Sequence, residues 1–337
     1  MGGKRRIVSG SRPTGRLHLG HLRGALVNWL RLQDEAECFF FVADWHALTT
    51  GWQDTGGVRD STREMVLDWL AIGLDPNRVV LFVQSAVKEH AELHLLLSMI
   101  VPTPWLLRNP TIKEQARELG LLGSGDDDTA MAQLNYGMLG YPVLQSADIL
   151  LYRATGVPVG IDQVPHLEMT REVARRFNHL YGKVLVEPEA LLTESPKIPG
   201  TDGRKMSKSY NNAVYLSEPP DDIARKLERM ATDPRRVRRT DPGDPNDCPA
   251  YNLHRIYCTP DELTVVNEGC RSAGIGCLDC KRIMIKHVLA EIAPIAARRA
   301  ELERTPEIVA DALASGNAKA QRAAAETMVG VREAMKI

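Results

Sequence analysis

Residues 5–26 of the chain read RRIVSGSRPTGRLHLGHLRGAL. A short apolar strand ends in glycine, and a turn rich in Gly and Pro then leads into a helix with apolar residues at Leu22 and Leu26. Free backbone N–H groups and the positive end of the helix dipole face such a turn, which suits phosphate. The stretch therefore predicts the first strand–turn–helix unit of a nucleotide-binding α/β fold.

The alternation of strand and helix signals continues beyond this unit. Residues 38–48 (CFFFVADWHAL) form an apolar run of strand length, residues 61–74 are amphipathic, and residues 78–85 predict a third strand. Strands that alternate with helices through short connections imply right-handed crossovers and a parallel sheet. We therefore expect an α/β fold built on a doubly wound, Rossmann-like parallel sheet.

The rest of the chain predicts an insertion, a return to the sheet and a second domain. A section punctuated by Pro and Gly predicts a helical insertion at about 89–138, and residues 141–178 return to the sheet and lead into a helix. Strand patterns fade after residue 216, and helical patterns dominate to the end. We predict a catalytic domain over residues 1–212 and an all-α domain over residues 213–337.

Composition indicates an ordinary globular protein. Of the 337 residues, 44% are hydrophobic and 25% are charged, and the net charge is −1. No apolar run approaches the roughly 20 residues that cross a bilayer, and no long apolar segment follows the basic start. We therefore expect a soluble, cytoplasmic protein without a membrane partner. The chain also lacks the P-loop and G-x-G-x-x-G patterns, which argues against a P-loop NTPase and a dinucleotide oxidoreductase.

Two short motifs carry the candidate chemistry. His18 and His21 flank Gly20, where imidazoles can donate hydrogen bonds to phosphate and glycine lets a ligand approach the backbone. KMSKS places Lys205 and Lys208 where two ammonium groups can neutralise a departing pyrophosphate. Taken singly, the motifs are also compatible with a structural histidine pair and a basic surface loop.

In combination, the two motifs resemble the signatures of the class I aminoacyl-tRNA synthetases. HLGH and KMSKS occur in the order that this class has. Further segments look like those of the bacterial tryptophanyl-tRNA synthetases, namely residues 10–26, 42–50, 141–152, 157–172 and 319–335. The resemblance implies a ligase that activates L-tryptophan with ATP, aided by Mg²⁺, and transfers it from tryptophanyl-adenylate to tRNA(Trp). It also implies a homodimer.

The same resemblance implies roles for individual residues. The groups that stabilise charge on the phosphates would be His18, His21, Lys205 and Lys208. Asp148 would accept the indole N–H, with a helix cap as its structural alternative. The other tryptophan contacts would be Gly10, His46 and Gln163. The ATP contacts would be Arg12, Gly20, Lys113, Gly160, Asp162, Met206 and Ser207. Gln145 departs from the methionine that is frequent in the family and predicts a more polar pocket wall.

Four of the six cysteines have a spacing that suits a metal centre. Cys248, Cys270, Cys277 and Cys280 follow the pattern C-x21-C-x6-C-x2-C, and four thiolates can hold a zinc ion or a cubane iron–sulfur cluster. Some bacterial tryptophanyl-tRNA synthetases carry a 4Fe–4S cluster on a similar pattern, so the resemblance favours iron–sulfur over zinc. Because the first gap here is one residue shorter than in that pattern, Cys258 remains the alternative to Cys248.

Two other functions stay open from the sequence. One is a tyrosyl-tRNA synthetase or a related HxGH nucleotidyl transferase, against which the segments SADILLY and VPVGIDQ argue. The other is a non-catalytic paralogue that binds RNA or senses redox state. The intact HLGH and KMSKS motifs argue against the second, because a protein without catalysis has no physical need for both phosphate-binding loops.

Overall fold

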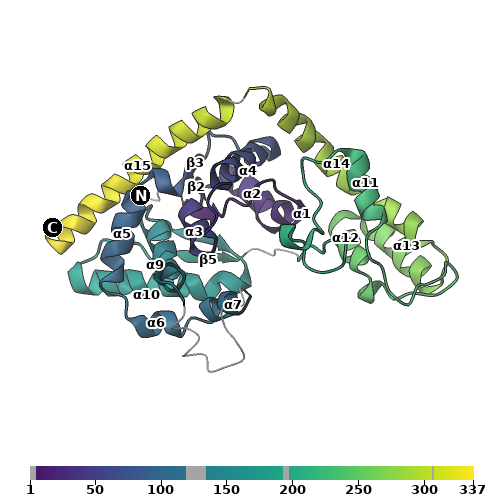
Figure 1. The fold of residues 1–337 in the computed structure, drawn as a ribbon, viewed down its shortest axis with the longest axis horizontal. Helices are drawn as coiled ribbons and strands as arrows, with labels where there is room; N and C mark the ends of the chain where they lie inside the picture. Colours follow the sequence, from purple (N-terminus) through teal and green to yellow (C-terminus); the bar gives the residue numbers. More distant parts are fainter. Residues whose placement is uncertain (1–4, 119–133, 193–196, 306) are drawn as a thin grey trace.

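A computed structural model describes residues 5–118, 134–192, 197–305 and 307–337. The described residues form one five-stranded parallel sheet in the order β3-β2-β1-β4-β5 (Figure 1). Its strands are β1 (Arg6–Ser11), β2 (Glu37–Val42), β3 (Val80–Val83), β4 (Gly156–Val159) and β5 (Glu189–Leu192). The chain runs outward to β3 and then crosses back to β4. The predicted doubly wound α/β fold is confirmed.

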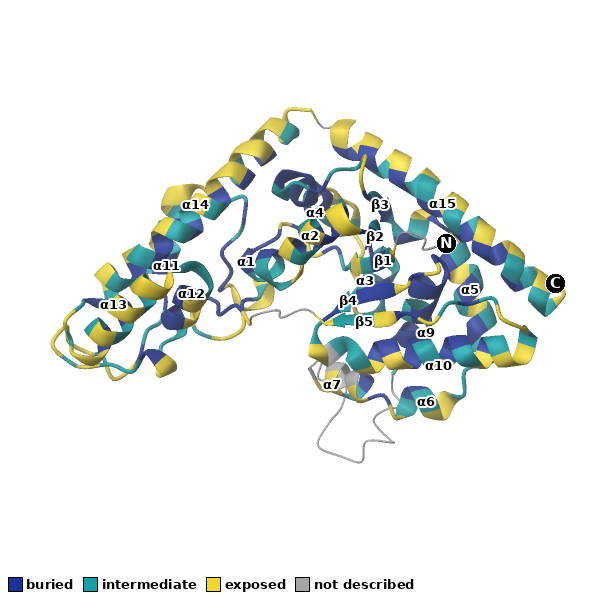
Figure 2. Ribbon diagram, turned by 180° about the vertical axis from the view of Figure 1, so that it is seen from behind, coloured by how far each residue is buried: buried dark blue, intermediate teal, exposed yellow. Residues whose placement is uncertain are grey.

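Successive strand residues point to opposite faces of the sheet and supply two separate cores. Ile7 and Phe40 belong to one buried cluster, whereas Val8, Phe39 and Phe41 belong to the other. This alternation follows from the two-residue period of a strand. Because helices cover both faces, nearly every residue of β2 is buried, which explains its continuous apolar run. Figure 2 shows these strands as the buried centre of the domain.

The first core contains the helix that follows the opening turn. The turn leads through α1 (Leu19–His21) and a π-helical turn, η1 (Leu22–Leu26), into α2 (Val27–Glu35). The helices α2 and α4 (Val58–Ile72) pack their tryptophans, Trp29 and Trp69, edge to face. The opposite face is covered by α5 (Glu89–Ser98), α9 (Tyr136–Leu150) and α10 (Val164–Tyr181).

Two segments differ from the sequence-based assignment. The strand expected over 38–48 ends at Val42, and α3 (Asp44–Gly51) begins directly after it. The change comes at Asp44, whose carboxylate accepts hydrogen bonds from the backbone N–H groups of Trp45 and Ser85, each at 3.0 Å. Similarly, residues 141–152 lie mainly in the helix α9 rather than in the sheet, which the chain rejoins only at β4.

The expected insertion consists of helices in its described part. It contains α5, α6 (Thr103–Leu107) and α7 (Pro110–Glu118), and residues 119–133 lie outside the described residues. The C-terminal part is also helical, as predicted. It comprises α11 (Pro220–Glu228), α12 (Pro249–Tyr257), α13 (Pro260–Arg271), α14 (Cys277–Glu303) and α15 (Glu307–Met335). None of the described helices combines the length and the apolar character that crossing a membrane requires.

The last helix returns to the sheet and covers its β3 edge (Figure 1). Asn317 accepts a hydrogen bond from the backbone N–H of Val83 at 2.9 Å, which pairs a group that an edge strand otherwise exposes. At Gly316 the helix comes so close that a Cβ atom would lie 1.7 Å from the carbonyl oxygen of Leu81. Helix α15 therefore packs on the sheet and its helices, although the sequence-based division assigns it to the all-α domain.

A buried ion pair joins the long helix α14 to the catalytic domain. The guanidinium of Arg299 contacts the carboxylate of Asp68 on α4 and, at 2.6 Å, that of Glu64. Asp68 also accepts a hydrogen bond from the backbone N–H of Leu17 at 2.6 Å. Arg299 and Asp68 are almost fully buried, so neither charge is tolerated without the other. The helical part and the loop before HLGH are thus held by the same carboxylate.

Candidate active site

The two histidines of HLGH are held in one tautomer by backbone hydrogen bonds. His18 Nδ1 accepts from the N–H of Gly20 at 3.1 Å, and His21 Nδ1 accepts from the N–H of His18 at 3.2 Å. An accepting Nδ1 carries no proton, so the proton of each neutral ring sits on Nε2. Burial, together with the neighbouring His21, lowers the pKa of His18 to about 3, and burial lowers that of His21 to about 4. Both side chains are therefore neutral Nε2–H donors near pH 7.

The KMSKS loop lies directly against this first motif. Leu19 donates its N–H to the carbonyl of Val214 at 3.0 Å, and Leu216 donates to Leu17 at 2.9 Å, just beyond KMSKS. Lys208 reaches across, and its Nζ donates to the carbonyl of Thr14 at 3.0 Å. Two motifs nearly two hundred residues apart in sequence thus meet at one place, and Lys208 lies against the Gly- and Pro-rich turn that precedes HLGH.

The other motif residues occupy distinct positions at this contact. Met206 is buried, whereas Lys205 and Lys208 are exposed. Ser207 caps the short turn η4 (Lys208–Tyr210). A Cβ atom on Gly20 would lie 2.9 Å from the ring of His18, so only glycine fits beneath that imidazole.

Asn212 holds the shape of the KMSKS loop, a role that the sequence-based analysis missed. Its Oδ1 accepts the N–H of Ser207 at 2.8 Å, and its Nδ2 donates to Asp202 at 2.7 Å and to the carbonyl of Lys205 at 3.2 Å. The residue is 2% exposed. The available sequence signal is an asparagine three residues after a basic motif. Once such an amide is buried, it needs hydrogen-bond partners for its polar atoms, and the loop backbone supplies them.

A cavity of about 230 Å³ opens beside β1, β2 and β4. All four predicted tryptophan contacts line it: Gly10, His46, Asp148 and Gln163. Arg12, predicted to contact ATP, lines the same cavity, as does Gln145. The apolar part of its wall consists of Val8, Phe41, Ala43, Ile149, Val157, Pro158 and Val159. We call this space the sheet cavity.

Asp148 is the acidic group of the sheet cavity, and three side chains donate to it. Its Oδ1 accepts from Gln84 Nε2 at 2.8 Å and from His90 Nδ1 at 2.7 Å, and its Oδ2 accepts from His46 Nε2 at 2.8 Å. Burial opposes its ionisation. The hydrogen bonds from His46 and His90 outweigh that cost and hold the pKa of the carboxyl below its ordinary value. Asp148 lies inside α9, not at its end, so the helix-cap alternative does not apply.

Phe41 forms a wall of the sheet cavity because its strand neighbour is glycine. Gly10 and Phe41 are register partners in β1 and β2. A Cβ atom on Gly10 would lie 2.4 Å from the Phe41 ring, well inside van der Waals contact. Gly10 therefore shapes the cavity by letting an aromatic side chain lie across the backbone.

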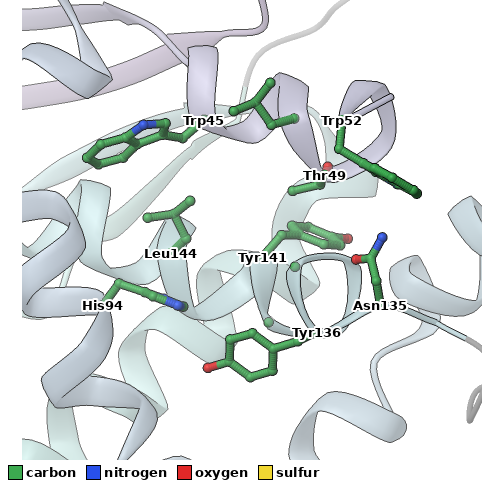
Figure 3. A pocket seen from close by; sticks show the side chains of 11 residues that line it. Trp45, Thr49, Trp52, His94, Asn135, Tyr136, Tyr141 and Leu144 are labelled. Atoms are coloured by element: carbon green, nitrogen blue, oxygen red, sulfur yellow. The ribbon is translucent and has the colours of Figure 1, made fainter. Parts of the chain in front are cut away.

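A larger cavity of about 450 Å³ lies between α3, α5 and α9 (Figure 3). Trp45, Thr49 and Trp52 lie on one side, and His94 and Tyr136 lie opposite them. Its described lining contains no acidic or basic group other than His94. The smaller sheet cavity, by contrast, has both Asp148 and Arg12.

The remaining predicted ATP residues are less fully described. Lys113 is half-buried on α7, and Gly160 precedes the short turn η3 (Ile161–Gln163) at the end of β4. The side chain of Asp162 lies outside the described residues.

The four predicted metal-binding cysteines gather around the ends of α12, α13 and α14. Cys248 precedes α12, Cys270 lies near the end of α13, and Cys277 and Cys280 occupy the first turn of α14. Burial and the neighbouring thiols, Cys248 first, raise the pKa of Cys280 to about 12. All are free thiols. His254 contacts this group, with Nε2 3.3 Å from the sulfur of Cys280.

Cys258, the alternative ligand, belongs to a second group with Glu262 and His287. These three offer ligand atoms within 4.8 Å of one another. Ordinary helix capping accounts for much of this geometry. Glu262 accepts the N–H of Thr259 at 2.9 Å at the start of α13, and His287 donates to the same carboxylate at 2.8 Å.

The family model described as tRNA synthetases class I (W and Y) matches residues 2–288. This chain belongs to that family. Two curated relatives named tryptophan–tRNA ligase match it over nearly their whole length. The Thermotoga maritima protein is 52% identical, covering 98% of this chain and 99% of its own, and the Aquifex aeolicus protein is 45% identical, covering 98% and 100%.

A solved member of the tRNA synthetase family also shares the architecture. The crystal structure of tryptophanyl-tRNA synthetase from Campylobacter jejuni, complexed with ADP and tryptophan, has a TM-score of 0.83 at 29% identity. The match covers 98% of this chain and all of the other. The resemblance inferred from HLGH and KMSKS therefore extends to the whole fold.

The neutral HLGH histidines predict that acid destabilises the protein. Because the pKa of His21 is about 4 in the folded chain and 6.5 ordinarily, its contribution to stability is complete above pH 6.5. That contribution is lost as the pH falls from 6.5 toward about 4, since the unfolded chain then binds a proton that the folded chain does not. Urea unfolding at pH 7.5 and pH 5.0 should show a smaller loss of stability for His21→Asn than for the unsubstituted protein.

The substitution His179→Asn is the matched control, because His179 is exposed on α10. It should leave the pH dependence unchanged. An equal acid-induced loss in His21→Asn and the unsubstituted protein would show that His21 is not held neutral.

Proposed function

We propose that this protein activates L-tryptophan with ATP and transfers it to tRNA(Trp), using the sheet cavity for the amino acid and the joined HLGH and KMSKS loops for the phosphates. The full-length similarity to tryptophan–tRNA ligases bears out the sequence-based prediction of the activity and enzyme class. The observation that carries the assignment of the site is the meeting of both signature loops at one place, beside a cavity with a buried carboxylate.

In the first step, a carboxylate oxygen of tryptophan attacks the α-phosphate of ATP, and the bond to the pyrophosphate oxygen breaks on the opposite side. The products are tryptophanyl-adenylate and pyrophosphate. Negative charge grows on the pyrophosphate as that bond breaks. The Nε2–H groups of His18 and His21 and the ammonium groups of Lys205 and Lys208 are the donors suited to stabilise it.

In the second step, a hydroxyl of the terminal ribose of the tRNA attacks the carbonyl carbon of the adenylate, and AMP leaves. No side-chain nucleophile takes part, so positioning and charge stabilisation supply the rate enhancement. Mg²⁺ enters with ATP, because this ion is usually bound through substrate phosphates and keeps several waters.

Recognition of tryptophan rests on the buried Asp148. An ionised carboxylate has about four acceptor positions, and His46, Gln84 and His90 fill three of them. The remaining position, on Oδ2, suits the indole N–H. A ligand that lacks this donor leaves a buried charge incompletely satisfied, which costs affinity. Arg12 and Gln163 line the same cavity and are suited to the carboxylate and ammonium of the amino acid.

For the four cysteines we propose a 4Fe–4S cluster held by Cys248, Cys270, Cys277 and Cys280. Burial, and then the neighbouring thiols, raise the pKa values of Cys270 and Cys280, and a cationic metal centre removes this electrostatic cost. Among the described residues no three cysteine sulfurs lie within 4.8 Å of one another, so the preference for iron–sulfur over zinc rests on the resemblance.

Cys248 is the preferred fourth ligand. Among the neighbouring thiols, Cys248 is the first to raise the pKa values of both Cys270 and Cys280, whereas Cys258 contributes least of the four at Cys280. When bound, such a cluster supplies a structural crosslink among helices of the domain predicted to bind the anticodon. The homodimer stays a prediction from the resemblance, and the cytoplasmic location stays a prediction from the composition and from the start of the sequence.

An ATP–pyrophosphate exchange assay tests the substrate. We expect exchange with tryptophan and none above background with tyrosine, because Asp148 and the sheet cavity are suited to indole. Exchange with tyrosine alone would overturn the assignment to tryptophan, and exchange with neither would favour the non-catalytic paralogue.

The substitution Lys208→Ala should lower the rate of adenylate formation at least about tenfold and leave the tryptophan Kd nearly unchanged, because the ammonium acts on charge that develops in the transition state. ATP–pyrophosphate exchange measures the rate of adenylate formation, and equilibrium dialysis measures the tryptophan Kd. Lys286→Ala, at an exposed lysine on α14, is the control and should change neither. An unchanged exchange rate in Lys208→Ala would count against the assigned role.

Metal analysis of anaerobically purified protein tests the cluster. We expect a brown protein with broad visible absorbance and about four iron atoms per chain. Cys248→Ser should lose the iron, and Cys258→Ser should retain it. A colourless protein with one zinc ion would refute the cluster, and the reverse pattern for the two variants would make Cys258 the ligand.

A further inference from the structure

The hydroxyl of Tyr152 contacts His90, which is one of the two histidines that donate to Asp148. His90 Nδ1 lies 2.7 Å from Asp148 Oδ1, and His90 Nε2 lies 2.7 Å from the hydroxyl of Tyr152. Both His90 and Tyr152 are 0% exposed. Tyr152 is outside the lining of the sheet cavity, so it does not touch a bound amino acid.

The pair is enclosed by aromatic rings that exclude water. The ring of Phe82 lies 6.0 Å from His90 and 5.3 Å from Tyr152, and the ring of Phe39 stacks on Tyr152 at 4.9 Å. In such surroundings an unpaired imidazole nitrogen or hydroxyl is costly, and each hydrogen bond is electrostatically stronger than in water.

The chemistry of the three groups sets the direction of their hydrogen bonds. An ionised Asp148 only accepts, so His90 must carry a proton on Nδ1. In the neutral ring Nε2 is then an acceptor, and its partner must be a donor. The hydroxyl of Tyr152 is that donor, and burial, followed by the charge of Asp148, raises its pKa well above the ordinary value, so it keeps its proton.

We propose that Tyr152 and His90 are positioning residues that select for the indole N–H of tryptophan by fixing the Asp148 carboxylate with one oxygen, Oδ2, turned to the ligand. This inference rests on the proposed role of Asp148 as the indole acceptor. Without the Tyr152 hydroxyl, Nε2 of His90 is a buried acceptor with no donor, and the ring loses the hydrogen bond that fixes its position. The ring can then turn, which weakens the bond from Nδ1–H to Oδ1 and releases the carboxylate from its orientation.

The test is the ratio of kcat/KM for tryptophan to kcat/KM for β-(3-benzothienyl)alanine, in which sulfur replaces the indole N–H. The unsubstituted protein should prefer tryptophan by about thirtyfold or more in ATP–pyrophosphate exchange, as expected for a site with a buried charged acceptor. Tyr152→Phe should lower this ratio at least about fivefold. Tyr181→Phe, which removes a hydroxyl from α10, is the matched control and should leave the ratio unchanged.

A double-mutant cycle separates positioning from packing. An asparagine amide has a fixed donor at about the place of Nδ1, so His90→Asn should keep the ratio within about twofold of the unsubstituted value. Because that shorter amide does not reach the Tyr152 hydroxyl, adding Tyr152→Phe to His90→Asn should produce no further loss of selectivity. A role of Tyr152 in packing alone would give the same loss in both backgrounds.

The outcomes distinguish this inference from the function on which it rests. An unsubstituted protein that uses both substrates equally well would overturn Asp148 as the indole acceptor, and the inference with it. A selective protein whose ratio survives Tyr152→Phe, or falls equally in both backgrounds, would overturn the positioning role and leave the proposed function intact. A loss of selectivity on Tyr152→Phe that occurs only where His90 is present supports the positioning role.

Discussion

The carboxylate of Asp148 is the constraint on which the active-site half of the molecule depends. It is a charge at 1% exposure, and it is tolerated because donors arrive from three other parts of the chain: His46 on α3, Gln84 at the end of β3 and His90 on α5. Each of these donors must be in place for the charge to stay buried. One carboxylate on α9 therefore fixes the mutual positions of the elements that enclose the sheet cavity.

The phosphate side of the site depends on a different kind of contact. There the two signature loops pair through their backbones, Leu19 with Val214 and Leu17 with Leu216, and the polar atoms of Asn212 hold the second loop in shape. Backbone pairing sets the distance between the loops, whereas the lysines stay exposed and able to respond to a ligand. Rigidly held loops with exposed cationic side chains are suited to stabilise charge in a transition state.

The helical part is tied to the same loop through Asp68. Leu17, just before HLGH, donates to that carboxylate, and Arg299 of α14 neutralises it from the other side. A displacement of α14 therefore acts on the residue just before the HLGH loop. This is a direct physical connection between the domain predicted to bind the anticodon and the first signature loop.

Much of the fold and of the chemistry was predictable from local patterns. The apolar run at 39–42, the turn at HLGH and the KMSKS motif are each short local patterns, and they predicted the parallel sheet and the two signature loops. The residues expected to contact tryptophan, from Gly10 to Gln163, do line one cavity. The fold assignments succeeded because period and turn chemistry are properties of neighbouring residues, whereas the roles of the site residues stay predictions.

Other features required the tertiary structure. The helical start at Asp44 depends on an N–H from Ser85, and the return of α15 to the β3 edge depends on the fit of Gly316 against Leu81. Gln84 and His90 belong to no motif, and nothing in the SADILLY segment that contains Tyr152 indicates its hydrogen-bond partner. By itself, the sequence determined the sheet, the two signature loops and the residue types of the site. Only the tertiary structure decided which buried polar groups meet, because a hydrogen bond depends on distance and direction in space, which spacing along the chain does not contain.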